Sequence, residues 1–248
     1  MRIEMVFSGF PGKMTTGYME WSTVVFLETE SRRVLFDTGG TGKRVNIVPR
    51  LKELGVDPET IDTLVLSHFH SDHIYNFDLF PNAAMYLHEA EASYAEKGGD
   101  PWQPPFFFKG IRDTGRLFLL KEGDSLAPGI DVLHLPGHTP GCMGLLLSAP
   151  DMPATVIAGD AVKNIAELAT GGAAMSLDRK ATSNSIRKVR DVAKRVIPGH
   201  DRILVVEDDR VLAQTAARET ILVPAGVVGP EVRCLELTLE PTWLPMVR

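Results

Sequence analysis

Short apolar runs alternate with longer segments of helical spacing along the chain. Many of the runs contain β-branched residues, which is typical of strands. They lie at 24–27, 33–36, 63–66, 85–87, 117–120, 131–135, 144–147, 154–158 and 232–239. Helical spacing predicts helices at 45–54, 89–96, 183–194 and 208–221. Strands precede helices in two successive halves and no glycine-rich phosphate loop occurs, so the pattern predicts an α/β layered fold.

One stretch, at residues 97–116, breaks this alternation. It contains the sequence Gly-Gly-Asp-Pro, and such clusters are typical of loops. Its aromatic residues are Trp102, Phe106, Phe107 and Phe108. We therefore expect an aromatic loop insertion here. No linker or repeat divides the chain, which predicts a single domain over 1–248 with a strand-like C-terminal extension at 222–248.

The composition is ordinary for a globular protein, with 44% hydrophobic and 23% charged residues. No apolar run is long enough for a transmembrane helix, and the N-terminus does not resemble a secretory signal. Cys142 and Cys234 give no disulfide framework. We therefore expect a cytoplasmic protein without a membrane partner. The formal charge of −6 disfavours nucleic acid as a partner, although folding can still gather a local basic patch.

Residues with metal-ligand chemistry gather in five short patches. These are Phe36-Asp37-Thr38-Gly39, Ser67-His68-Phe69-His70-Ser71-Asp72-His73, Pro136-Gly137-His138, Gly159-Asp160 and Pro198-Gly199-His200. Several follow predicted strands, where rigid scaffolds present functional groups. His68 and His70 face the same way at the end of an extended segment, so both imidazoles can reach one ion. Asp72 and His73 follow where the chain turns, and they can face a second ion.

Each candidate ligand also has an ordinary structural interpretation. A lone histidine is usually a surface or core residue, and an aspartate after glycine, such as Asp160, is usually a turn residue. Three histidines and an aspartate within residues 68–73 are rarely structural. The shared Pro-Gly-His context then makes His138 and His200 candidates for the missing ligands.

Together these motifs resemble the metallo-β-lactamase superfamily. All five occur in the family order over roughly residues 20–205, and Phe-Asp-Thr-Gly at 36–39 is similar to the first family motif. The sequences at 37–40, 73–76 and 79–81 look most similar to the small stand-alone metallo-β-lactamase domain-containing protein 1 group, and lactonase-like features are also present. The resemblance implies an αββα sandwich, with two mixed β-sheets and helices on the outer faces.

The resemblance also implies a dinuclear metal centre. One ion would be bound by His68, His70 and His138, and the other by Asp72, His73 and His200. Asp160 would bridge the two ions, and Asp37 would orient a ligand without binding metal. Imidazole and carboxylate ligands without thiolate suit zinc, manganese or iron. We expect two divalent ions, with zinc favoured.

This site predicts a metal-dependent hydrolase. Two neighbouring ions lower the pKa of a shared water towards ~7, and we expect the metal-bound hydroxide to attack a small ester, lactone or thioester. Asp72 is the expected catalytic residue, which orients the hydroxide and passes its proton to the leaving group. A phosphodiesterase or ribonuclease of the same fold is the alternative. A β-lactamase or a non-catalytic, metal-stabilised binding domain ranks lower.

The substrate pocket has candidates in two aromatic segments and beside the bridging aspartate. They are Tyr18, Met19, Trp21, Trp102, Phe106, Phe107, Phe108 and Lys163. They favour a small-molecule substrate with an apolar part, but core or dimer-contact positions explain any one of them as well. Lactonases of this superfamily carry a tyrosine shortly after the bridging aspartate, whereas Ala161-Val162-Lys163 follows Asp160 here and contains none. The strand-like tail at 232–239 hints at strand pairing in a homodimer.

Overall fold

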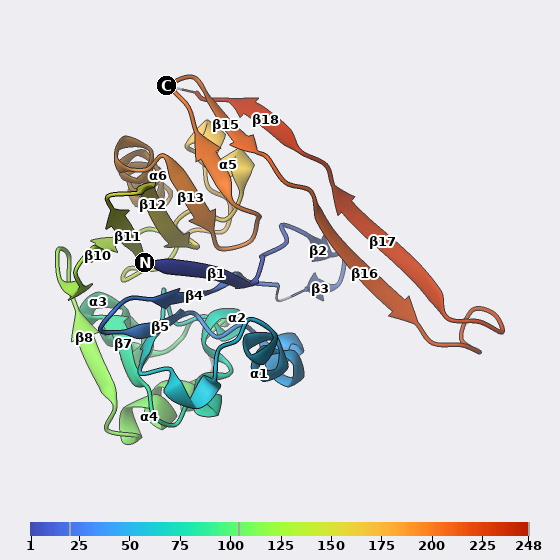
Figure 1. Ribbon diagram of the computed structural model, residues 1–248, viewed down its shortest axis with the longest axis horizontal. Coiled ribbons are helices and arrows are strands. Elements are labelled where there is room, and N and C mark those ends of the chain that lie inside the picture. The colour runs from blue at the N-terminus through green and yellow to red at the C-terminus, as the bar shows by residue number, and fades with distance from the viewer. Residues whose placement is uncertain (20, 104, 248) are drawn as a thin grey trace.

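The computed structural model describes residues 1–19, 21–103 and 105–247. Its body consists of two β-sheets that pack face to face, with helices against the outer face of each (Figure 1). Two small strand pairs lie outside these sheets. The predicted αββα sandwich is thereby confirmed.

The first sheet has six strands in the order β1-β4-β5-β6-β7-β8. They are β1 (Arg2–Phe7), β4 (Val24–Glu28), β5 (Arg33–Phe36), β6 (Thr63–Val65), β7 (Ala84–His88) and β8 (Leu117–Leu120). β1, β4 and β5 pair antiparallel, whereas β5 to β8 run parallel. The helices that cover this sheet are α1 (Arg44–Glu53), α2 (Ser71–Ile74), α3 (Glu89–Lys97) and α4 (Pro105–Asp113).

The second sheet has eight strands in the order β18-β15-β14-β13-β12-β11-β10-β9. They are β9 (Ser125–Ala127), β10 (Ile130–His134), β11 (Met143–Ala149), β12 (Met152–Gly159), β13 (Arg195–Pro198), β14 (Leu204–Val206), β15 (Arg210–Ala213) and β18 (Thr242–Pro245). β12 and β13 pair parallel, and the other neighbours pair antiparallel. Its outer face is covered by α5 (Ile165–Thr170) and α6 (Arg179–Val192). Three short 3-10 helices are η1 (Thr41–Lys43), η2 (Pro58–Thr60) and η3 (Phe77–Leu79).

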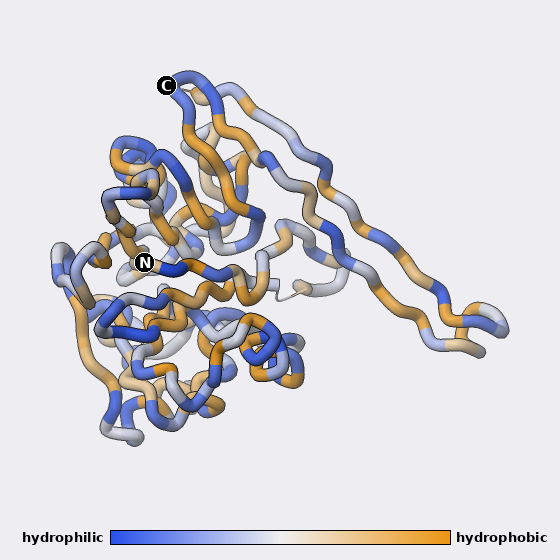
Figure 2. The backbone as a smooth tube through the Cα atoms, viewed as in Figure 1, coloured by the Kyte–Doolittle hydropathy of each residue, from blue (hydrophilic) through white to orange (hydrophobic). Residues whose placement is uncertain are grey.

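Alternate residues of the inner strands serve two different cores. In β4, Val25 and Leu27 point between the two sheets, whereas Val24 and Phe26 point outward beneath the helices. Successive side chains of a strand face opposite ways, so a strand that is covered on both faces is apolar throughout. This explains the continuous apolar runs in the sequence, which mark the body strands in Figure 2.

The predicted helix at 208–221 is wrong. This stretch forms β15 and then β16 (Ala217–Val223). Val211 and Ala213 are buried on alternate positions, and β15 pairs with both β14 and β18. The helical spacing at 208–221 is only a weak local preference. Pairing with other strands outweighs it, so the stretch forms strands in place of the predicted helix.

The stretch at 97–116, expected to be a loop, contains the helix α4. The helix begins at Pro105, because proline is well suited to the first helical position, where its missing N–H leaves no hydrogen bond unmade. Phe108 and Ile111, one turn apart, are buried against the first sheet. Only the first part of the aromatic segment is therefore a loop.

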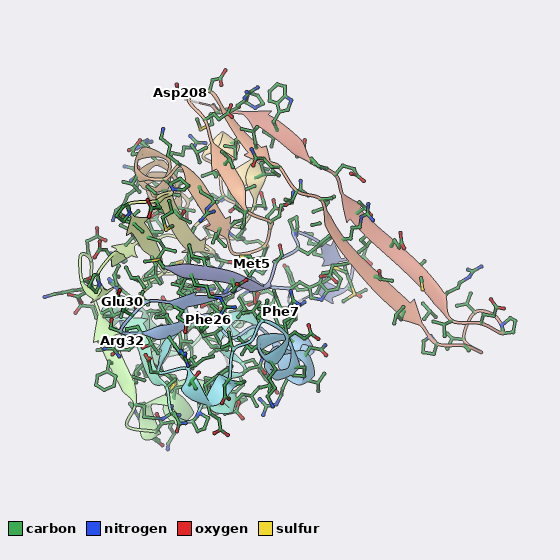
Figure 3. The ribbon with its side chains drawn as sticks, in the orientation of Figure 1. Met5, Phe7, Phe26, Glu30, Arg32 and Asp208 are labelled. Atoms are coloured by element: carbon green, nitrogen blue, oxygen red, sulfur yellow. The ribbon has the colours of Figure 1, made fainter. Side chains whose placement is uncertain are left out.

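Five strands lead into the predicted metal-ligand patches at one edge of the two sheets. β5 leads into Asp37, β6 into 67–73, β10 into the loop with His138, β12 into Asp160 and β13 into His200. Figure 3 shows Glu30 and Arg32 in the turn that joins β4 to β5, at the opposite end of β5 from this edge. Across the described residues, no helix combines the length and apolar character needed to cross a membrane.

A long hairpin projects from the body (Figure 1). It consists of β16 (Ala217–Val223) and β17 (Arg233–Leu239), so the predicted strand at 232–239 is confirmed. We call residues 217–239 the arm. A second, much shorter pair, β2 (Lys13–Met14) and β3 (Gly17–Tyr18), lies in the N-terminal segment.

Candidate metal centre

The side chains predicted as metal ligands converge in one cluster. Its members are His68, His70, Asp72, His73, His138, Asp160 and His200. Within three overlapping groups, one ligand atom from each residue lies within 4.8 Å of the others. The groups are His68, His70 and His138; His68, His73 and Asp160; and Asp72, His73 and His200. Because these groups share residues, the cluster is continuous, with room for more than one ion.

Asp160 stands in the middle of the cluster with one carboxylate oxygen toward each end. Its Oδ2 lies 3.4 Å from Nε2 of His138. Its Oδ1 lies 3.3 Å from Nε2 of His73 and 3.2 Å from Nε2 of His200. Ligand atoms around a tetrahedral zinc ion are about 3.3 Å apart, since each is about 2.0–2.1 Å from the metal. The two oxygens are therefore spaced to share an ion with different histidines.

The other distances between ligand atoms within the cluster are similar. Nε2 of His138 lies 3.1 Å from Nδ1 of His70. On the other side, Oδ2 of Asp72 lies 3.5 Å from Nε2 of His73 and 3.4 Å from Nε2 of His200. Each end of the cluster thus presents several donor atoms at the spacing of a metal coordination shell.

Three inward-facing atoms of the cluster are buried without a hydrogen-bond partner among the described residues. They are Nε2 of His68, Nε2 of His73 and Oδ1 of Asp160. A buried polar atom that lacks a partner costs about 1–3 kcal/mol. Three such atoms in one cluster, all of metal-ligand chemistry, fit divalent ions as the missing partners.

Every histidine of the cluster has its other ring nitrogen held from outside. The contacts are His68 Nδ1 to Ser67 Oγ at 2.9 Å, His70 Nε2 to Asp100 Oδ2 at 3.2 Å, His73 Nδ1 to Asp37 Oδ2 at 2.8 Å, His138 Nδ1 to the Met175 carbonyl at 2.9 Å, and His200 Nδ1 to the Trp21 carbonyl at 3.2 Å. A hydrogen bond at one ring nitrogen fixes the tautomer and leaves the lone pair on the other. The inward nitrogens are therefore prepared to bind metal.

Asp37 is the hub of the hydrogen bonds behind the cluster. Its Oδ2 accepts from Ser67 Oγ at 2.8 Å as well as from His73, and its Oδ1 accepts from the Ser67 backbone N–H at 2.7 Å. Ser67 in turn contacts His68, so one carboxylate reaches two histidines. Asp37 adopts a left-handed backbone conformation with φ of 59°. Burial raises the pKa of Asp37, which its contacts with His73 and Ser67 only partly oppose.

Burial keeps part of the cluster neutral. It lowers the pKa of His138 to about 3, and it lowers the pKa of His68 well below the usual value, helped by the neighbouring histidines. Neutral imidazole is the form that binds metal, so at neutral pH these two side chains need not lose a proton first.

The carboxylates shift the pKa values of His73 and His200 in the opposite direction. Burial disfavours charge at His73 and His200, but Asp72 and Asp160 outweigh it and raise the pKa of both. Burial likewise opposes ionisation of Asp160, yet His200 and His73 hold its pKa well below the usual range. A metal ion would replace the protons of these histidines as the positive charge beside the carboxylate.

The glycines of the two Pro-Gly-His motifs have identifiable tasks. A Cβ on Gly199 would lie 2.1 Å from Oδ1 of Asp160, so only glycine lets the chain pass behind that carboxylate. Gly137 has φ of +135°, and a Cβ there would lie 2.2 Å from the backbone nitrogen of Thr182. These motifs therefore permit a close approach of backbone to the cluster and to α6.

Two of the predicted pocket residues meet at the mouth of the cluster. The rings of Tyr18 and Trp102 are 4.7 Å apart and perpendicular, and the Tyr18 hydroxyl lies 3.7 Å from Sδ of Met175. The Trp102 carbonyl accepts from the Ser71 backbone N–H, within the ligand segment. We call Tyr18, Trp102 and Met175 the rim. All three side chains are exposed, at 41%, 42% and 48%.

The phenylalanines of the aromatic segment lie elsewhere. Phe108 is buried in the core with its ring 5.4 Å from that of Phe69, and Phe107 packs against Tyr75 at 5.3 Å. Phe106 is exposed on α4 and touches Phe107. For Phe107 and Phe108 the structure therefore favours the core interpretation over the pocket one.

Of the remaining pocket candidates, Trp21 and Lys163 contact the cluster through their backbone carbonyls. Trp21 packs edge-on against Phe10 at 5.5 Å and supplies its carbonyl to His200. Met19 is partly buried. Lys163 is buried, with Nζ 3.3 Å from Oε1 of Glu167, and its carbonyl accepts from the His200 N–H. Neither Trp21 nor Lys163 belongs to the rim.

The outer contacts from Asp100, Met175 and Trp21 were not predicted from the sequence. Met175 and Trp21 act through backbone carbonyls, which every residue type has, so the sequence carries no signal for them. Asp100 had a weak signal, because a carboxylate in a Gly-Gly-Asp-Pro loop has no evident structural partner nearby in the chain. Its oxygen also accepts from the Tyr94 hydroxyl at 3.0 Å.

Comparison with known proteins decides the family. The model of the metallo-beta-lactamase superfamily matches residues 18–200, which include every member of the cluster. The chain belongs to this superfamily. The resemblance seen in the motifs is thus confirmed.

Two relatives illustrate the similarity in sequence. Metallo-beta-lactamase domain-containing protein 1 of Xenopus laevis is 29% identical over 167 residues, which are 67% of this chain and 65% of that protein. The match thus spans slightly less than two thirds of that relative. An N-acyl homoserine lactonase of a Bacillus species is 26% identical over 203 residues, which are 71% of this chain and 79% of the lactonase.

Solved structures share the fold. A Thermotoga maritima protein superimposes with a TM-score of 0.64 at 24% identity, covering 82% of this chain and 98% of that one. AidC, a dizinc quorum-quenching lactonase, gives a TM-score of 0.63 at 19% identity, covering 75% and 76% of the two chains.

The hydrogen-bond hub at Asp37 yields a prediction for metal affinity. Asp37→Asn keeps the shape but replaces one acceptor oxygen with a donor, so His73 and Ser67 lose part of their orientation. We expect metal affinity to fall roughly 10–100-fold, the range for such outer contacts, in competition titrations with a chelator. Asp131→Asn, a partly buried strand residue away from the cluster, is the control and should bind metal as the wild type does. Unchanged affinity in Asp37→Asn would contradict the role of the hub.

Proposed function

We propose that this protein holds two divalent ions, zinc by preference, and hydrolyses a small ester, lactone or thioester. The observation that carries the proposal is the position of Asp160, whose two oxygens face different histidines. The first ion is held by His68, His70 and His138, and the second by Asp72, His73 and His200. Asp160 bridges them, and Asp37 orients His73 and, through Ser67, His68.

Two divalent ions held by these residues would supply the acidification of a water and the polarisation of the substrate oxygen. The protein's own contribution to the reaction falls to Asp72. Its side chain is 23% exposed, compared with 6% for Asp160, so it is the carboxylate of the cluster that substrate can approach. One oxygen faces His200 and His73, and we assign to the other the task of taking the proton of the attacking water. The same oxygen can then deliver that proton to the leaving group.

The rim supports a carbonyl substrate with an apolar portion. Tyr18 and Trp102 present ring faces and edges to solvent beside the ligand segment, and Met175 adds an adaptable thioether. An acyl chain that is laid against them would remove apolar surface from water on both sides. A longer phosphodiester such as RNA would also need cationic side chains beside the metal centre for its backbone, and Lys163 is already paired with Glu167. The relatives that are N-acyl homoserine lactonases support the same substrate class.

A substrate panel on protein reconstituted with zinc, manganese or iron tests the proposal. It contains an acyl-homoserine lactone, an aryl ester, a lactoyl thioester, an activated phosphodiester, a short RNA and a cephalosporin. We expect turnover of one or more carbonyl substrates, and loss of both turnover and bound metal in His70→Ala and Asp72→Ala. His134→Ala removes a histidine outside the cluster and should retain both. Turnover of the phosphodiester or RNA without carbonyl hydrolysis would contradict the substrate class.

The rim predicts a dependence on acyl-chain length. Trp102→Ala should lower kcat/KM for a long-chain acyl substrate roughly tenfold, since the contact of one methylene with an apolar pocket is worth about 1–3 kcal/mol. A short-chain substrate and the metal content should be unaffected. Phe118→Ala, which removes an exposed aromatic side chain on β8, is the matched control. An equal loss for all chain lengths would indicate a disturbed metal centre in place of a lost acyl contact.

A further inference from the structure

The arm is a two-stranded sheet that extends beyond the body. Its seven residue pairs, from Ala217 with Leu239 to Val223 with Arg233, run in register without a bulge. Among the described residues no third strand pairs with it. A lone hairpin of this kind is marginally stable in water, and its open edges invite pairing with another chain. The arm therefore lacks the packing partner that a stable two-stranded sheet requires.

The base of the arm is nevertheless firmly built. β15 and β18, which flank the arm in the chain, pair as the edge of the second sheet. The buried Arg202 side chain donates to the carbonyls of Leu239 and Glu240, each at 3.0 Å. The direction in which the arm leaves the body is thus set by buried hydrogen bonds, which would serve little purpose for a flexible tail.

The two faces of the arm differ in character. Residues opposite each other in an antiparallel pair lie on the same face. One face, which we call the apolar face, carries Ala217, Glu219, Ile221, Val223, Arg233, Leu235, Leu237 and Leu239. The other face carries Arg218, Thr220, Leu222, Cys234, Glu236 and Thr238. Figure 2 shows hydrophobic positions along both strands, out to the tip.

The apolar face is complementary to itself in one orientation. Its centre is the pair Ile221 and Leu235, both exposed. Glu219 lies one pair of this face toward the base, and Arg233 lies one pair toward the tip. A two-fold axis through the central pair would place a second arm face to face with the first and antiparallel to it. Glu219 of each copy would then lie against the pair of the other copy formed by Val223 and Arg233. A two-fold interface requires such self-complementarity.

The same axis gives the exposed tip of the arm a place to bind. When this two-fold axis passes by Ile221, residues 225–227 of one copy lie beside residues 215–217 of the other. There a groove of about 270 Å³ lies between the base of the arm and the body. It is lined by apolar side chains that include Met5, Phe10 and Ile203, together with Ala217 and Glu219 of the arm. Val227 and Val228 at the tip are exposed and of the size to enter it.

We propose that the arm is a dimerisation element, which packs antiparallel against the arm of a second copy and inserts its tip into the groove at the partner's base. The arm face alone, roughly 24 Å long and 10 Å wide, falls short of the ~800 Å² per subunit of a standard interface. The tip and groove supply the remaining contact. The dimer buries both the unpartnered face and the exposed valines.

Size-exclusion chromatography with light scattering, over a dilution series, tests the proposal. Wild-type protein is expected at twice the chain mass, and Ile221→Glu is expected at the monomer mass or with a dissociation constant raised tenfold or more. Leu222→Glu is the matched control, because it adds the same charge one residue away on the opposite face, and it should remain dimeric. Metal content and circular dichroism of Ile221→Glu should match the wild type, which separates lost association from misfolding.

A charge exchange tests the antiparallel register. Glu219→Arg alone would set an arginine beside the pair that contains Arg233 of the second copy. Arg233→Glu alone would set a glutamate against the pair that contains Glu219. Because each change brings like charges together, each should weaken the dimer. The double variant should restore it, since opposite charges again meet across the axis.

Three results would overturn the proposal. The first is a wild-type protein that stays monomeric at every concentration. This includes a monomer whose arm binds phospholipid vesicles, because the arm would then have a membrane as its partner. Another is equal disruption by Leu222→Glu and Ile221→Glu. The third is a double charge variant that is no more dimeric than either single variant.

Discussion

The structure depends on one carboxylate buried among histidines. Asp160 is almost wholly enclosed, and an ionised group in such a place costs several kcal/mol unless opposite charge surrounds it. The protein surrounds it with His73, His138 and His200, each within 3.4 Å of an oxygen. Two of these histidines, His73 and His200, face one oxygen, and His138, which burial keeps neutral, faces the other, where a metal ion would supply the opposite charge.

The fold serves this arrangement through the ends of its strands. The carboxyl ends of β5 and β6 in one sheet, and of β10, β12 and β13 in the other, meet at the same edge, so five segments of the chain deliver ligands or their supports to one point. Contacts from outside then fix each histidine ring, and Asp37 holds two of them through a single side chain. Gly199 matters equally, because any side chain there would displace Asp160.

The sequence predicted the chemistry of the site better than its surroundings. His68, His70 and Asp72 stand in a short run that few structural roles explain, so the sequence alone was enough to expect their convergence with His138 and His200. The carbonyls of Trp21 and Met175 could not be expected in this way, because an acceptor of this kind depends on where the backbone passes. The strands were also largely predictable, since burial on both faces makes them apolar throughout.

Failures of prediction occurred where distant partners decide the local structure. The stretch at 208–221 became two strands through pairing with β14, β17 and β18, and a local pattern cannot reveal which strands will pair. Phe107 and Phe108 could line a pocket or fill a core with the same sequence, and the start of a helix at Pro105 turned them inward. Tyr18 and Trp102 meet only because the N-terminal segment crosses the mouth of the metal centre.

Anomalous diffraction from crystals of the zinc-loaded protein tests the central claim most directly. Two peaks are expected, about 3.5–4 Å apart, with one oxygen of Asp160 on each, His138 beside the first and His200 beside the second. A single peak, or two peaks bound to the same oxygen of Asp160, would contradict a centre built around a bridging carboxylate.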